Sequence, residues 1–195
     1  MDRIIQAYSG VFAIVCRYWR EYGGWKALVF SPYFHAAVGL TLLLAHYWQN
    51  EPWWDVALSV LPNIIGFALG GYAIWLGFGD EEFRHKISER PAEGGASPYM
   101  QVSAAFAHFV IVQILALLGA LIAKANSFEL TADHWLGHIL VANNLPLNYI
   151  NLHIAPWFWG LGFMLFVYGL MTAIAATLAV FRVAYWFEHV RNNRK

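Results

Sequence analysis

Residues 157–181 read WFWGLGFMLFVYGLMTAIAATLAVF, a stretch of 25 positions without a charged side chain. Uninterrupted apolar stretches of about 18 residues or more are typical of helices that cross a lipid bilayer. Further uncharged runs cover 27–50, 56–79 and 94–123, so the pattern recurs along the chain. The sequence therefore predicts an all-α integral membrane protein.

The amino-acid composition agrees with this class. Of the 195 residues, 59% are hydrophobic and 12% are charged, whereas a soluble domain has about 25% charged residues. The 12 basic residues balance the 12 acidic ones, which argues against a polybasic nucleic-acid-binding protein. Cys16 is the single cysteine, so a disulfide within the chain is excluded.

We expect four transmembrane helices, over about 27–48, 56–79, 100–123 and 157–187, because each run meets the requirement of roughly 20 residues. Lysine and arginine gather before the first run, between the second and third, and after the fourth. The positive-inside rule then places both termini in the cytoplasm. The chain is thus predicted to be a multi-pass protein of the inner or plasma membrane, with a 27–187 membrane domain and a basic cytoplasmic tail over 188–195.

The N-terminal segment 1–26 has a different pattern. Apolar side chains such as Ile4, Tyr8 and Val15 share one face of a helix, whereas Arg3 and Arg17 lie on the other. This amphipathic pattern is typical of a helix that lies in the membrane interface. We expect the segment to lie on the cytoplasmic surface of the bilayer.

The long outer segment 124–156 is expected to carry a short helix. Thr131 is a suitable N-cap for it. Trp135 and Ile139 would then lie on one side of this helix, which we expect to rest on the outer face of the bundle.

Small and polar residues recur in the second run at alternating steps of four and three, which places them on one helix face. We call this face the small-residue seam; it comprises Ser59, Asn63, Gly66, Gly70, Ala73 and Gly77. Such seams let helices approach closely in lipid. Three interpretations remain open: packing against the fourth span, where Gly162 and Gly169 form a matching seam, the lining of a pore in a homo-oligomer, or a closed symmetric contact.

The polar side chains within predicted hydrocarbon include His35, His108 and Gln113. Polar groups there are costly and often functional. His35 and His108 lie at matching depths, so they are candidates to bind a haem b iron from both sides. The alternative is that both imidazoles donate hydrogen bonds to a helix carbonyl or to Gln113.

His134 and His138 are spaced i, i+4, which places two imidazoles on one helix face as in some metal sites. The glutamate of the H-E-x-x-H motif and a nearby third ligand are missing. We therefore interpret this pair as a weak metal candidate beside a solvated histidine face. Apart from the haem alternative, the sequence indicates no cofactor.

The motifs of nucleophilic and phosphate chemistry are missing from the sequence, which argues against an enzyme. The leading hypothesis is a small homo-oligomeric subunit that acts as a membrane sensor or anchor for a soluble cytoplasmic partner, as in stress or antiphage systems. A homo-oligomeric ion channel lined by the small-residue seam is the first alternative. A redox subunit that binds haem b through two histidines is the second.

Overall fold

The computed structural model describes residues 2–92, 94–126, 132–151 and 155–192, and all regular secondary structure in these ranges is helical. The longest helices are α5, α7 and α10, which are long and apolar enough to cross a membrane. This confirms an all-helical chain, and it confirms apolar helices over three of the four predicted spans. The helices are α1 (Asp2–Tyr22), α2 (Gly24–Val29), α3 (Pro32–Leu43), α4 (Ala45–Asn50), α5 (Trp53–Gly77), α6 (Glu81–Ser88), α7 (Pro98–Ala125), α8 (Trp135–Ala142), α9 (Leu147–Tyr149) and α10 (Ala155–Asn192).

The predicted first span over 27–48 is not one continuous helix. The chain breaks before Pro32, which begins α3 after the extended residue Ser31, because proline disfavours helical backbone in the residue before it. A second break falls at Leu44, close to Thr41, whose carbonyl accepts a hydrogen bond from the indole of Trp48 at 2.9 Å. The middle piece, α3, has 12 residues, or about 18 Å of helix, which is too short to cross a bilayer of about 30 Å.

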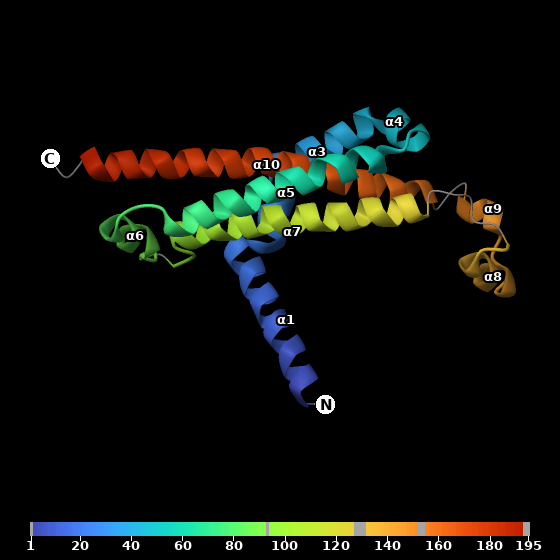
Figure 1. The fold of residues 1–195 in the computed structure, drawn as a ribbon, viewed down its shortest axis with the longest axis horizontal. Helices are drawn as coiled ribbons and strands as arrows, with labels where there is room; N and C mark the ends of the chain where they lie inside the picture. The colour runs from blue at the N-terminus through green and yellow to red at the C-terminus, as the bar shows by residue number, and fades with distance from the viewer. Residues whose placement is uncertain (1, 93, 127–131, 152–154, 193–195) are drawn as a thin grey trace.

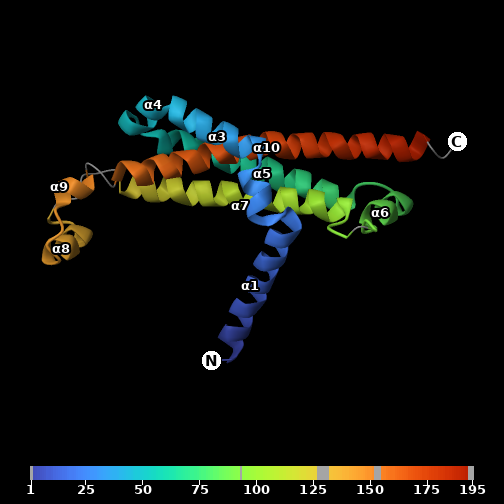
Figure 2. The same ribbon diagram turned by 180° about the vertical axis from the view of Figure 1, so that it is seen from behind.

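The three long helices lie side by side and form an elongated bundle (Figure 1, Figure 2). α7 packs against both α5 and α10, and α3 packs against α10. We call the two ends of the bundle the α6 end and the α4 end, after the short helices found there. α10 continues past α7 at the α6 end, where the C-terminus lies.

Tryptophan rings and glycines fit together near the α4 end. Trp53 is fully buried, and its ring lies about 3.0 Å from the position that a Cβ on Gly162 would occupy. Trp48 lies similarly close to Gly160. The glycines of α10 therefore leave the space that the indoles fill. Phe163 meets Trp53 edge to face and Phe166 lies roughly parallel to it, which completes this part of the core.

A second apolar cluster holds the α6 end together. Asp80 caps α6 by accepting a hydrogen bond from the backbone N–H of Phe83 at 2.8 Å. The Phe83 ring is fully buried and meets Phe78 and Phe187 edge to face. Gly79 has a φ of +85°, a backbone conformation that glycine adopts without strain, so the chain turns tightly from α5 into α6.

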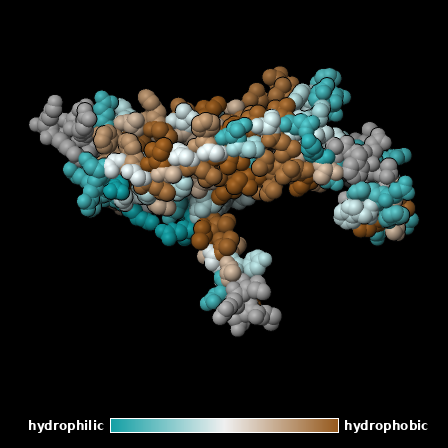
Figure 3. Space-filling view, viewed as in Figure 1, coloured by the Kyte–Doolittle hydropathy of each residue, from teal (hydrophilic) through white to brown (hydrophobic). Residues whose placement is uncertain are grey.

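Helix α1 does not join the bundle lengthwise. Its C-terminal end meets the bundle near the middle, and the rest of it extends away from the long helices (Figure 1, Figure 2). In Figure 3, hydrophobic residues dominate the half of the bundle between α1 and the α4 end, whereas hydrophilic residues gather around α6. The helix predicted for the N-terminal segment is thus confirmed, and the structure sets it at a steep angle to the long helices.

The prediction for the outer segment is wrong in part. A short helix, α8, forms there, but Trp135 and Ile139 are 65% and 51% exposed. α8 packs against α9 and lies beyond the end of the long helices (Figure 1), so these side chains do not rest on the bundle. Thr131, the expected cap, lies outside the described residues, and His134 takes the N-cap position.

Candidate functional site

A buried polar cluster joins α1 to the bundle, and His108 of α7 lies at its centre. Nδ1 of His108 is 2.6 Å from the hydroxyl of Tyr18 in α1. Nε2 of the same ring is 2.8 Å from the hydroxyl of Tyr168 in α10. An imidazole with one ring proton donates through one nitrogen and accepts through the other, and a phenol can do either. The 5% exposed His108 therefore has both polar atoms satisfied.

Stacking adds a further contact between α1 and this histidine. The ring of Tyr22 lies parallel to that of His108, with centroids 3.8 Å apart. Phe34 of α3 meets Tyr168 edge to face at 5.6 Å. We call Tyr18, Tyr22, His108 and Tyr168 the His108 cluster; it connects α1, α7 and α10 at one point.

The rest of α1 has little contact with the protein. Every side chain from 5 to 17 is exposed, and the exposed set includes Tyr8 and Phe12 at 75% and 70%. A monomeric soluble protein rarely exposes such a continuous apolar surface. α1 is therefore an amphipathic arm that is attached at its C-terminal end only.

Burial changes the chemistry of the phenols at this attachment. It raises the pKa of Tyr18 to about 12, and the neighbouring Tyr22 adds to the increase. Burial likewise raises the pKa of Tyr22. Both side chains consequently stay protonated near neutral pH, so the Tyr18 hydroxyl keeps its proton for the contact with His108.

The structure does not bring His35 and His108 together as a pair of iron ligands. His35 is exposed on α3, whereas both ring nitrogens of His108 are hydrogen bonded to tyrosine hydroxyls. In this conformation His108 has no nitrogen left for a haem b iron. The expected alternative partners of His108, a helix carbonyl or Gln113, are also not the ones observed.

Gln113 is fully buried near Gly169 of α10. Its Nε2 donates a long hydrogen bond of 3.5 Å to the Gly169 carbonyl, which also accepts from the Thr172 hydroxyl at 2.8 Å. Its Oε1 has no hydrogen-bond partner among the described residues. This amide therefore gains little from its own polar groups.

The weak metal candidates remain without a ligand set. His134 caps α8, and His138 is exposed one turn later. Within 2–92, 94–126, 132–151 and 155–192, no three histidine, cysteine, aspartate or glutamate side chains gather closely enough to hold a metal ion.

The small-residue seam of α5 faces outward. All six of its residues are exposed, and a Cβ added to Gly66, Gly70 or Gly77 would meet nothing within 4 Å. The opposite face of α5, with Leu61 and Trp75, packs into the bundle. The interpretation that the seam packs against the fourth span is thus wrong, although Gly162 and Gly169 of α10 do pack closely against Trp53 and Leu61.

A shallow groove of about 600 Å³ follows the seam past Pro62, Asn63, Gly66, Phe67 and Gly70. The polar groups on it are bonded within the helix, because Ser59 donates to the Val56 carbonyl and Asn63 to the Ser59 carbonyl. In a membrane, an exposed face of this kind lets another helix approach closely.

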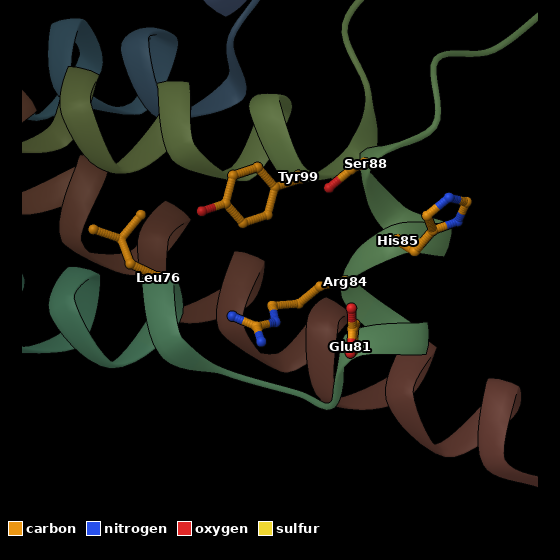
Figure 4. Close-up of a pocket in the computed structure, with 6 residues that line it drawn as sticks. All are labelled: Leu76, Glu81, Arg84, His85, Ser88 and Tyr99. Carbon is orange, nitrogen blue, oxygen red and sulfur yellow. The ribbon is translucent and has the colours of Figure 1, made fainter.

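An open cavity of about 470 Å³ lies beside α6 (Figure 4). Arg84 and Tyr99 extend toward the same side of it, whereas His85 points away. Nδ1 of His85 lies 3.3 Å from Oε1 of Glu89. The lining side chains do not form a nucleophile and base pair or a ligand set. The cavity therefore has no evident catalytic arrangement.

Comparisons with protein-family models, curated proteins and solved structures find no match to this chain. The proposed function therefore rests on the geometry of the described residues. The sequence singled out His108 but missed its tyrosine partners. The one available signal was the i, i+4 spacing of Tyr18 and Tyr22, which places both rings on the same side of α1.

Proposed function

We propose that this chain is a membrane sensor subunit, in which α1 lies in the cytoplasmic interface and transmits a change there to a soluble partner. The observation that carries the proposal is the His108 cluster, in which Tyr18 of an exposed amphipathic arm is hydrogen bonded to His108 of α7, and His108 in turn to Tyr168 of α10. A movement of α1 must break or shift these bonds. The same movement would therefore shift Tyr168 and with it α10, which continues to the α6 end.

Two features support an interfacial position for α1. An amphipathic helix lies in the plane of the membrane, and α1 projects at a steep angle from a bundle whose long helices are the candidate spans (Figure 2). From His108 to Ala125, α7 advances 17 residues, or about 26 Å, which is close to the hydrocarbon thickness of about 30 Å. The bundle between α1 and the α4 end is thus of suitable length to fill the bilayer.

In this arrangement α6 and the end of α10 lie in the cytoplasm and form the docking face for the partner. α6 supplies a charged surface, with His85 and Glu89 side chains 79% and 65% exposed. Specific soluble partners are commonly held by such exposed polar rims together with apolar anchors.

Site-specific photocrosslinking in the native membrane tests this proposal. A photoreactive residue at His85 should capture one soluble polypeptide, whereas the same residue at Trp157, which is 78% exposed near the other end of the bundle, should capture none. The Tyr18→Phe variant should reduce the adduct at position 85, since it weakens the α1 attachment. A protein that gives no adduct at 85, or equal adducts at both positions, is not a sensor of this kind.

A homo-oligomeric channel is a second candidate, and the outward face of the seam favours it. In a ring of subunits, Ser59 and Asn63 would line one half of a pore and the glycines the other. Gly70→Leu or Ala73→Leu should then abolish conductance in planar bilayers. Leu69→Ala is the control and should leave the conductance unchanged, because Leu69 is exposed but is not part of the seam. Wild-type currents in Gly70→Leu would exclude the seam as a pore lining.

A further inference from the structure

A cavity of about 430 Å³ lies where the end of α1 meets α7 and α10. Three elements far apart in sequence build it. Its lining includes Arg20 and Glu21 from α1, Val102 and Ala105 from α7, and Arg182 and Trp186 from α10. The cavity adjoins the His108 cluster through Tyr22, which lines it as well.

The charges around this cavity favour an anion. Arg20 and Arg182 are exposed and form no ion pair within the described part of the chain. Glu21 is the acidic member of the lining, but its side chain is 12% exposed and its Oε1 lies 3.7 Å from Nη2 of Arg90. Because Arg90 offsets the carboxylate, the two guanidinium groups leave the cavity with an excess of positive charge.

The lining of the cavity is amphipathic. Apolar groups of Val102, Ala105 and Ala179 lie beside the arginines, and the indole of Trp186 is half-buried among them. Arginine binds phosphate through two parallel N–H donors. Tryptophan favours the level of lipid headgroups, where its ring meets acyl chains and its N–H meets water.

We propose that this cavity binds the phosphate of an anionic phospholipid headgroup, held between Arg20 and Arg182. The choice of a lipid over a free phosphate rests on the proposed function, because α1 then places the cavity at the cytoplasmic headgroup layer. Anionic lipids of that leaflet attract basic side chains near the surface. A lipid bound there would contact α1 and α10 together and so favour the attached position of α1.

Lipid binding to the purified chain in neutral detergent tests this inference. Native mass spectrometry would count bound phosphatidylglycerol and, at equal concentration, phosphatidylcholine. Wild type should retain one phosphatidylglycerol per chain, and Arg20→Gln or Arg182→Gln should each weaken binding roughly tenfold, the effect of losing one charge-assisted contact. Arg17→Gln is the matched control, since Arg17 is exposed one turn earlier on α1 and does not line the cavity.

Three results would overturn the assignment. Equal binding of both lipids would show that the headgroup charge is not read, and equal weakening by Arg17→Gln would show that any α1 arginine serves. Inorganic phosphate that binds in calorimetry as tightly as phosphatidylglycerol would identify a soluble anion as the occupant. Circular dichroism of each variant would check that its helical content is kept. Because this assay contains no soluble partner, it can succeed or fail independently of the crosslinking experiment.

Discussion

Replacing Tyr18 with phenylalanine removes one hydroxyl from the His108 cluster and keeps the ring. The lost contact is the 2.6 Å hydrogen bond to Nδ1 of His108, a side chain that is 5% exposed. A buried polar atom left without a partner costs about 1–3 kcal/mol, whereas hydrogen bonds between membrane helices average about 0.6 kcal/mol and reach about 1.7. Both ranges together place the loss of stability at about 1–2 kcal/mol.

The assay is reversible unfolding in mixed micelles, followed by circular dichroism, for Tyr18→Phe and for Tyr8→Phe. Tyr8 lies on the same helix and is 75% exposed, so its hydroxyl should change stability by no more than about 0.5 kcal/mol. A nitroxide on Cys16, the single cysteine and an exposed one, reports the mobility of α1 without an added cysteine. Tyr18→Phe should raise this mobility, and Tyr8→Phe should not.

A double-mutant cycle separates the bond from other effects of the substitution. In a His108→Phe background the partner nitrogen is gone, so Tyr18→Phe should then cost close to nothing and the coupling energy should be about 1 kcal/mol. The reasoning is refuted if Tyr18→Phe costs the same in both backgrounds, or if it costs no more than Tyr8→Phe.

Three further predictions follow from the same structure. In a Cys16→Ser background, nitroxides are placed at Val15 and Ala13, on opposite faces of α1. The label at Val15 should collide mainly with oxygen, and the label at Ala13 mainly with a water-soluble nickel complex. Equal accessibility of the two labels would place α1 away from the interface. Gln113→Leu should lower the stability by less than about 1 kcal/mol or raise it. The reason is that Oε1 of Gln113 has no hydrogen-bond partner among the described residues, and removing buried unpaired polar groups is often neutral. A loss above about 2 kcal/mol in the unfolding assay would show that the amide stabilises the fold. The pKa of Tyr18 is raised to about 12 from the ordinary value of about 10. The stability that depends on its protonated form should therefore be complete below pH 10 and lost as the pH rises toward 12. The mobility of the Cys16 label should increase over this pH range in the wild type, and Tyr18→Phe should remove the part of the increase that is due to Tyr18.

The sequence was sufficient for the three long helices, because charge is missing from 56–79, 94–123 and 157–181. The run 27–50 has the same composition, yet it is divided at Pro32 and Leu44. Transmembrane helices tolerate proline where neighbours satisfy the backbone, so hydropathy alone does not separate a kinked span from a broken one. The second break accompanies the Trp48 indole bond to the Thr41 carbonyl, a side-chain contact that no periodicity reports.

The candidate site was harder to predict for a related reason. Heptad spacing places Gly66 and Gly70 on one face but does not say which neighbour, if any, covers that face; the structure leaves it uncovered. His108 is conspicuous as a polar residue within an apolar run, but its partners lie 90 residues earlier and 60 residues later. Such distant pairs depend on how the helices assemble, which local sequence patterns do not encode.

The wide spacing of the His108 cluster also determines when α1 can reach its final position during synthesis. Tyr18 leaves the ribosome 150 residues before Tyr168, an interval of roughly 10–30 s at bacterial and eukaryotic elongation rates. His108, the hydrogen-bond partner of Tyr18, is made 90 residues after Tyr18, and Tyr168 follows 60 residues later. A nascent chain that stalls before α10 can therefore form the bond between Tyr18 and His108, but it leaves the other nitrogen of His108 without Tyr168.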